Sequence, residues 1–330
     1  MKPRSVAAFI LLLSLTLFFA SWGVFGHEKI NHTAVLALPE GIQLFFYNHI
    51  DFITQESTVP DLRKYTLNDE HERPRHFIHL ESYGGIKEVP QNLVDLNKKY
   101  DQEFVSHHGI LPWHICRLTD MLTRAFREKR KTEILFLAAD LGHYVADAHM
   151  PLHTSLNHDG ELTGQRGIHS FWEAQLPDLF GKEYTFKVRE AKYMNAIEKE
   201  VWTMIYSSHQ LVDTLLIADK NLKKNFPEGN IYLKESNGNI AKNKFNKPIH
   251  SAAYSKMYHD ALNHMVENQM QKAISFTADL WLTAWINAGK PDLTDLDPSD
   301  LSRRNAVLLG EELQLLKSGK LLELKSEREF

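Results

Sequence analysis

The sequence has little of what marks several common protein classes. It contains one cysteine, Cys116, so no disulfide bond can form within the chain. Runs that alternate polar and apolar residues are scarce, and the best of them, residues 184–188, is short. There is no internal repeat and no low-complexity tract. These absences argue against a disulfide-stapled scaffold, a repeat protein and a mainly β fold.

The chain also lacks a strong charge of either sign, because its formal net charge is −4. This total gives no basic footprint for nucleic acid, although it would not reveal a local basic patch. What the chain has instead is 43% hydrophobic residues over 330 positions, enough to bury one substantial core.

Apolar residues recur at three- and four-residue steps in several long stretches, which is the spacing of one helical face. These stretches are residues 39–55, 110–129, 190–220 and 250–288. Residues 222–249, rich in Asn, Lys and Gly, are expected to form a long loop. We therefore predict an all-α fold with a single multi-helix domain over residues 22–290. Residues 291–330 would add a linker and a C-terminal helical appendage.

The first 21 residues have the pattern of a signal peptide. Lys2 and Arg4 form a basic start, and residues 6–20 are apolar. The run is short for a membrane span. Cleavage after Ser21 places Phe19 where a small residue is preferred, so a retained N-terminal anchor stays open as an alternative. We expect a secreted or periplasmic protein of a bacterial envelope.

Five residues of metal-ligand type lie between positions 143 and 173. They are His143, Asp147, His153, His169 and Glu173. The His143–Asp147 and His169–Glu173 pairs have the i, i+4 spacing that puts two side chains on one helical face. A solvated polar stripe would explain one such pair. Two pairs with a linking histidine, in an otherwise apolar segment, favour a metal site, and imidazole with carboxylate suits zinc.

The segment around these residues resembles a known family. Residues 141–147 read LGHYVAD and residues 150–153 read MPLH. Together they resemble the core motif of the zinc-dependent phospholipase C and single-strand-specific nuclease superfamily, all-helical enzymes that use three zinc ions. The family's upstream ligands are an N-terminal Trp, a nearby His, and an Asp followed by a His. Residues of these types stand in that order here, at Trp22, His27, Asp61 and His76.

The resemblance implies three zinc sites built from nine residues. One zinc would be held by Asp61, His76, His143 and Asp147. A second would be held by His153, His169 and Glu173. The third would be held by His27, Asp147 and the backbone amine and carbonyl of Trp22, provided that Trp22 is the first residue of the mature chain.

This site predicts hydrolysis of a phosphodiester by a zinc-bound hydroxide. Asp61 is a candidate catalytic base. Arg63 and Lys64, which follow it closely, are candidate contacts to the phosphate, with an exposed surface charge as the plain alternative for each.

The substrate class is the open question. Glu173 resembles the phospholipase branch, because the nucleases carry Asp there, whereas the Trp22–His27 and Asp61–His76 spacings resemble the nuclease branch. We favour a phospholipase C-like enzyme, with a phospholipid substrate and peripheral membrane contact. The alternative is a nuclease for single-stranded DNA or RNA. A non-catalytic zinc-binding envelope protein is disfavoured, since structural zinc sites are usually closed four-ligand sites. No protein partner is indicated.

Overall fold

The computed structural model describes residues 23–67, 69–243 and 246–318. Helices make up nearly all of the regular structure in these ranges. The part of the chain that is described contains no β-strand, only isolated bridges between residues 232 and 250, 234 and 240, and 242 and 248. The predicted all-α fold is therefore confirmed. The predicted signal peptide and Trp22 lie outside the described residues.

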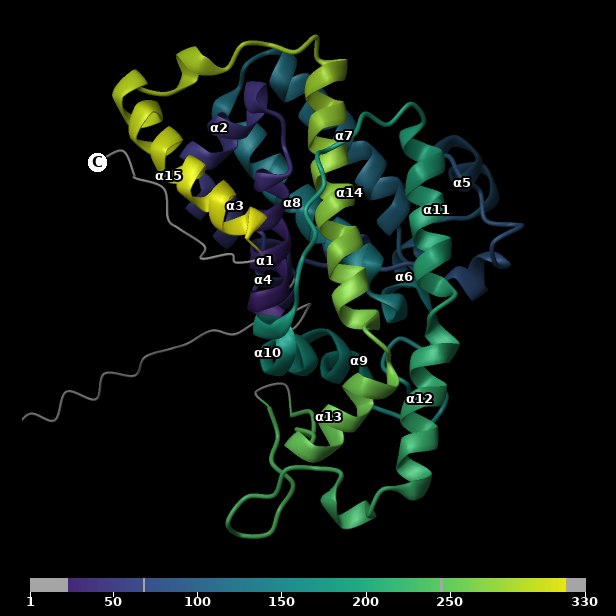
Figure 1. The fold of residues 1–330 in the computed structure, drawn as a ribbon. Coiled ribbons are helices and arrows are strands. Elements are labelled where there is room, and N and C mark those ends of the chain that lie inside the picture. The colour runs from purple at the N-terminus through teal and green to yellow at the C-terminus, as the bar shows by residue number, and fades with distance from the viewer. Residues whose placement is uncertain (1–22, 68, 244–245, 319–330) are drawn as a thin grey trace, which may run out of the picture.

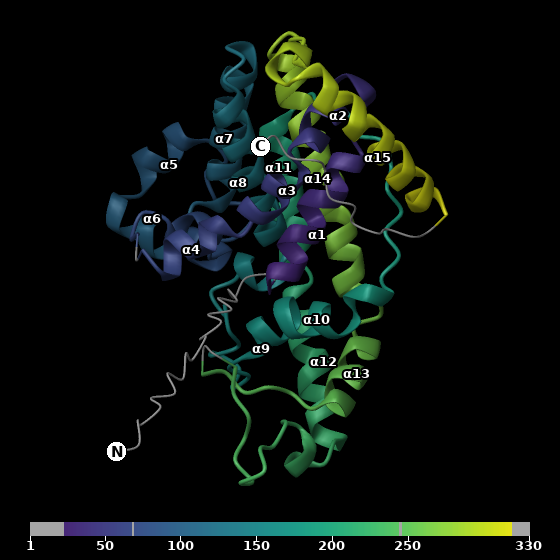
Figure 2. The ribbon, with the colours of Figure 1, turned by 90° about the vertical axis from the view of Figure 1, so that its left-hand side faces the viewer.

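The core of the domain is built around α8 (Lys131–His149). From Ile134 onward the residues of α8 are buried, except for the exposed Phe136 and the half-buried Asp140, as expected of a central helix. Its neighbours are α1 (Gly23–Leu36), α3 (Ile50–Glu56), α7 (Leu111–Arg127), α11 (Ile197–His209) and α14 (Met265–Asn287). Several of these helices run side by side in Figures 1 and 2.

A second group of shorter helices lies below this bundle in Figure 1 and has its own apolar cluster. It contains α9 (Ile168–Ser170), α10 (Leu176–Phe180), α12 (Val212–Asn225) and α13 (Ala252–Ala261), with a π-helical turn at Phe171–Gln175 between α9 and α10. Of the other helices, α2 (Glu40–Asn48), α5 (Leu93–Lys99) and α6 (Gln102–His108) contribute buried residues to the larger core, and α4 (Val59–Tyr65) contacts α8.

Three of the predicted long helices are each divided in two. The 39–55 stretch breaks at His49 between α2 and α3, and the 190–220 stretch breaks between α11 and α12. In the 250–288 stretch, Asn263 and His264 have positive φ angles of 46° and 62°, which end one helix and redirect the next. The apolar period continues across each break, so the sequence does not reveal it.

The C-terminal helix, α15 (Ser299–Lys317), lies within the stretch predicted as a linker and helical appendage, and it packs against α2. Its Glu312 is fully buried and accepts a hydrogen bond from Tyr47 Oη at 2.9 Å. The other oxygen of Glu312 lies 2.6 Å from His32 Nε2 on α1. These buried polar contacts join the C-terminal helix to the domain core.

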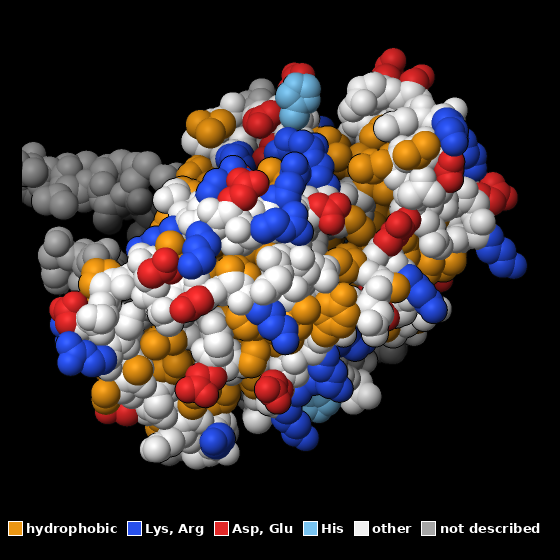
Figure 3. All heavy atoms as spheres, turned by 90° about the horizontal axis from the view of Figure 1, so that it is seen from above, with side chains coloured by type: hydrophobic (Ala, Val, Ile, Leu, Met, Phe, Trp, Pro, Cys, Tyr) orange, Lys and Arg blue, Asp and Glu red, His pale blue; other side chains and the backbone are white. Residues whose placement is uncertain are grey.

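The distribution of charged side chains on the surface is consistent with the small net charge. On the end of the molecule seen in Figure 3, lysine and arginine side chains are interspersed with acidic ones. Among the described helices, none combines the length and the apolar character needed to cross a bilayer.

Candidate metal centre

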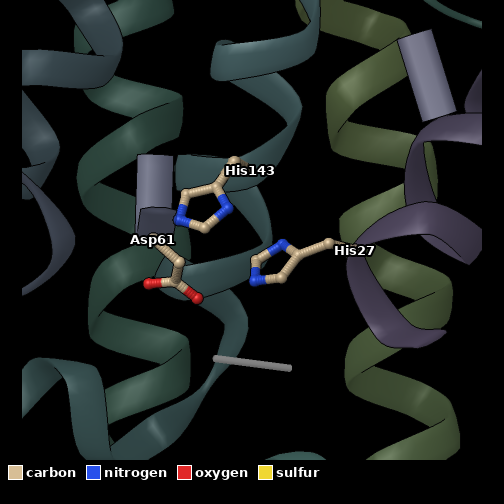
Figure 4. Close-up of side chains that lie close together, drawn as sticks. All are labelled: His27, Asp61 and His143. Carbon is tan, nitrogen blue, oxygen red and sulfur yellow. The ribbon is translucent and has the colours of Figure 1, made fainter. Parts of the chain in front are cut away.

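Eight of the nine predicted ligands come together where α8 meets the second group of helices. These ligands come from seven different elements. Four lie on α-helices of the bundle: His27 on α1, Asp61 on α4, and His143 and Asp147 on α8. The other four lie on short elements: His76 and His153 on 3-10 helices, His169 on α9 and Glu173 on the π-helical turn. All except His169 are buried. Figure 4 shows His27, Asp61 and His143 converging from three separate elements.

The first group is formed by His76, His143, Asp147 and Asp61. His76 Nδ1 lies 2.8 Å from Asp147 Oδ2 and 3.1 Å from His143 Nε2. His143 Nε2 lies 3.3 Å from the same Asp147 oxygen, and Asp61 Oδ1 lies 3.7 Å from His76 Nδ1. The ligand atoms of His76, His143 and Asp147 thus lie within 4.8 Å of one another, close enough to bind one metal ion together, and Asp61 groups in the same way with His143 and His27.

The second group is formed by His153, His169 and Glu173. His169 Nε2 lies 2.9 Å from Glu173 Oε1, and His153 Nε2 lies 3.3 Å from Glu173 Oε2. Each carboxylate oxygen therefore faces one imidazole. The i, i+4 pair predicted from the sequence does place both side chains on one face, at the junction of α9 and the π-helical turn.

Asp147 lies between the groups. Its Oδ2 faces His76 and His143, whereas its Oδ1 lies 3.7 Å from His27 Nε2 and 3.9 Å from His153 Nε2. The His27 ring also stacks on that of His143 at 4.0 Å, and both lie close to Asp61. This position suits a carboxylate shared between metal ions.

Three of the histidines are oriented by the backbone. His143 Nδ1 donates to Ser57 O at 2.8 Å, His153 Nδ1 to His76 O at 2.5 Å, and His169 Nδ1 to His158 O at 2.8 Å. Because a carbonyl oxygen only accepts, the proton of each ring is on Nδ1 and the lone pair of Nε2 points into the centre. That is the tautomer a metal requires, so these residues fit zinc.

The electrostatics favour ionised carboxylates. Burial tends to lower the pKa of His143 and His169, but Asp147 and Glu173 raise it, so these two rings must release a proton when a metal binds. Burial alone would raise the pKa of Asp147, but His143 and His153 hold it well below its usual range. Glu173 behaves similarly: burial opposes ionisation, and His169 and His153 lower the pKa. Burial, together with the neighbouring His143, lowers the pKa of His27 to about 3. Ionised carboxylates and a neutral imidazole are the forms that bind metal.

The two cations near Asp61 have different surroundings. Lys64 Nζ lies 3.2 Å from Asp61 Oδ1 and forms part of a pocket wall. Arg63 instead makes a paired contact with Asp140 and donates to Glu72. The phosphate contact of Arg63 stays a prediction: its guanidinium is bonded to Asp140 and Glu72, and Arg63 is absent from the pocket lining.

A pocket of about 500 Å³ opens onto the centre, with the ligands His76 and His153 in its wall. The sequence analysis missed most of the rest of its lining: Tyr65, Arg73, Phe77, His79, Leu156, His158 and Glu161. The one available signal was position, because Phe77 and His79 directly follow His76, and His158 follows His153 by five residues. The Phe77 and His79 rings are stacked at 4.6 Å.

Comparison with known proteins decides the family. The S1/P1 nuclease family model matches residues 22–280, most of the chain. The chain belongs to the S1/P1 nuclease family. This confirms the resemblance seen in the ligand motif, and it makes the protein a hydrolytic phosphodiesterase of a zinc-dependent family. No curated protein matches the chain.

In this S1/P1 family member, Asp147 should matter more to metal binding than Glu173, because Asp147 faces four histidines and Glu173 faces two. We expect Asp147→Asn to lose more than one zinc per chain and Glu173→Gln about one. Metal analysis of the purified variants, alongside turnover, measures this. Equal losses, or a fully loaded Asp147→Asn protein, would show that Asp147 is not shared.

Proposed function

We propose that this protein is a secreted nuclease that cleaves single-stranded DNA or RNA at a centre of three zinc ions. The observation that carries the proposal is the lining of the pocket beside the metal ligands. It combines the cations Lys64 and Arg73 with the rings of Tyr65, Phe77 and His79. Cations that meet phosphate and rings on which bases stack are the two elements of single-strand binding.

The proposal reverses the sequence-based preference for phospholipid. That preference depends on Glu173 alone. An acyl chain needs an apolar rim, and in this pocket Leu156 is the one aliphatic side chain among the lining residues. The family match also points toward nucleic acid.

The residues around the centre have distinct roles in this proposal. Zinc ions, when bound, supply charge that activates water and stabilises the phosphoryl oxygens. Lys64 lies beside Asp61, and although burial opposes protonation, that carboxylate raises the pKa of Lys64, so it stays positive and can orient a phosphate. Burial tends to raise the pKa of Asp61, but Lys64 and His143 lower it. We therefore assign Asp61 first to metal binding, because a lowered pKa makes it a weak base.

Substrate class is tested by assaying the purified mature protein on several substrates in parallel. We expect cleavage of single-stranded DNA and RNA, slower cleavage of duplex DNA, and none of phosphatidylcholine vesicles. Tyr65, half exposed at the pocket, should contribute a stacking surface. Tyr65→Ala should raise KM for single-stranded DNA by about tenfold, equivalent to about 1.4 kcal/mol of base stacking, whereas Tyr65→Phe should not.

A matched control is Tyr193→Ala, since Tyr193 is exposed to a similar degree but is absent from the pocket lining. The rate at which each variant hydrolyses a small chromogenic phosphodiester checks that its metal centre is still active. Hydrolysis of the vesicles, with nucleic acids left intact, would replace the proposal by a phospholipase C. A zinc-loaded protein inactive on all of these substrates would overturn the assignment of a phosphodiesterase.

We further propose that the first 21 residues are removed on secretion and that the new amine at Trp22 completes the third zinc site. In support, His27 Nε2 on α1 lies 3.7 Å from Asp147 Oδ1, and the sequence places Trp22 five residues before His27. The mature protein should begin at Trp22 by intact mass. A cytoplasmic form with Met before Trp22 should hold less zinc. A retained leader, or full zinc content in the extended form, would contradict this.

A further inference from the structure

Glu72 is a fully buried carboxylate that lies behind one metal ligand, His76. The two nitrogens of the His76 ring face opposite ways. Nδ1 faces the metal centre, 2.8 Å from Asp147 Oδ2, while Nε2 lies 3.4 Å from Glu72 Oε1. The imidazole thus spans the gap between the centre and Glu72.

His76 is oriented differently from three of the other ligand histidines. His143, His153 and His169 turn Nε2 toward the centre and anchor Nδ1 on a backbone carbonyl. His76 turns Nδ1 inward, so its buried outward nitrogen Nε2, which makes no hydrogen bond, faces a side-chain carboxylate at 3.4 Å instead. A charged acceptor on the far side of a ligand histidine fixes the tautomer and makes the ring a stronger electron donor.

Glu72 itself is held firmly. Tyr144 Oη donates a hydrogen bond to Oε1, and Arg63 Nε and Arg75 Nη1 donate to Oε2 at 3.0 and 2.9 Å. With a phenol and two guanidinium groups donating to it, the carboxylate is fixed in position facing Nε2 of His76.

The same network connects the segments that supply the first group of ligands. Arg63 lies two residues after Asp61 on α4, and Glu72 lies one turn before His76. Arg63 also pairs with Asp140 at 2.7 Å, and Asp140 and Tyr144 flank His143 on α8. The network thus fixes the relative positions of Asp61, His76 and His143 from behind.

We propose that Glu72 is a positioning residue for the metal centre. It accepts the Nε2 proton of His76, holds Nδ1 toward the metal and strengthens that nitrogen as a ligand. Arg63, Arg75 and Tyr144 keep Glu72 in place. The role assigned to Arg63 is thus structural support of a ligand. The inference depends on zinc binding at this centre and not on the substrate, so it is tested separately from the nuclease proposal.

The test is the zinc affinity of the full mature protein, measured by competition with a chelator. Glu72→Gln keeps the shape of the side chain and removes its charge. We expect the tightest zinc at the His76 group to bind 10- to 100-fold more weakly, with the His153–His169–Glu173 group unchanged. Glu70→Gln is the matched control, because Glu70 is exposed and carries the same chemical change two residues away.

In Glu72→Gln, Arg63 and Arg75 lose the charge of their shared partner, which can lower the stability of the fold itself. A milder variant is therefore needed as well. Tyr144→Phe removes one hydrogen bond to Glu72 and should weaken zinc binding a few-fold. Tyr47→Phe is its control, since Tyr47 also donates to a buried glutamate, Glu312, away from the centre. Nitrogen-15 NMR of the His76 ring in the zinc-loaded protein should show the proton on Nε2.

Two results would overturn the inference. One is unchanged zinc affinity in both Glu72→Gln and Tyr144→Phe. The other is a loss that affects all zinc sites equally and follows a fall in the melting temperature of the metal-free protein, because that pattern indicates a general role in folding.

Discussion

The structure depends on one buried carboxylate and the histidines gathered around it. Asp147 has no exposure to solvent, and histidines from α1, α8 and two 3-10 helices approach its two oxygens. Burying a charge is costly unless it is paired or coordinates a metal. A zinc ion on each side of Asp147 would compensate this cost. It would also link segments that lie more than a hundred residues apart in the sequence.

The fold is arranged to meet that requirement. The central helix α8 is buried along most of its length, and among its mainly apolar buried residues it presents His143 and Asp147 to the centre. The backbone then fixes three of the rings through carbonyl acceptors, and Glu72 is placed to fix a fourth. Rigid support of this kind holds metal ligands in the correct geometry before the ion arrives.

The features that the sequence predicted correctly depend on the spacing of residues that are close together in the chain. The i, i+4 pairs His143–Asp147 and His169–Glu173 follow from helical geometry, and the all-α fold follows from apolar periodicity. Asp61 and His76 could be found only by family resemblance, because their approach to α8 is a tertiary contact. The same holds for Arg63: its position beside Asp61 suggested a phosphate contact, whereas its partners, Glu72 and Asp140, lie 9 and 77 residues away.

Other features could not be read from the sequence because they depend on packing. The breaks near His49 and His264 are turns inside continuous apolar patterns. The burial of Glu312 against α1 and α2 turns a polar residue of a C-terminal helix into a core contact. The pocket wall joins residues from α4 with residues from the loops after His76 and His153, and no local pattern predicts that combination.

The most direct test of the account is zinc content measured together with thermal stability. The mature protein should contain three zinc ions per chain. Their removal by a chelator should abolish activity and lower the melting temperature by on the order of 10 °C, because a ligand that binds only the folded state stabilises it by several kcal/mol. Added zinc should restore both. A protein that melts at the same temperature and keeps its activity after verified removal of zinc would contradict the account.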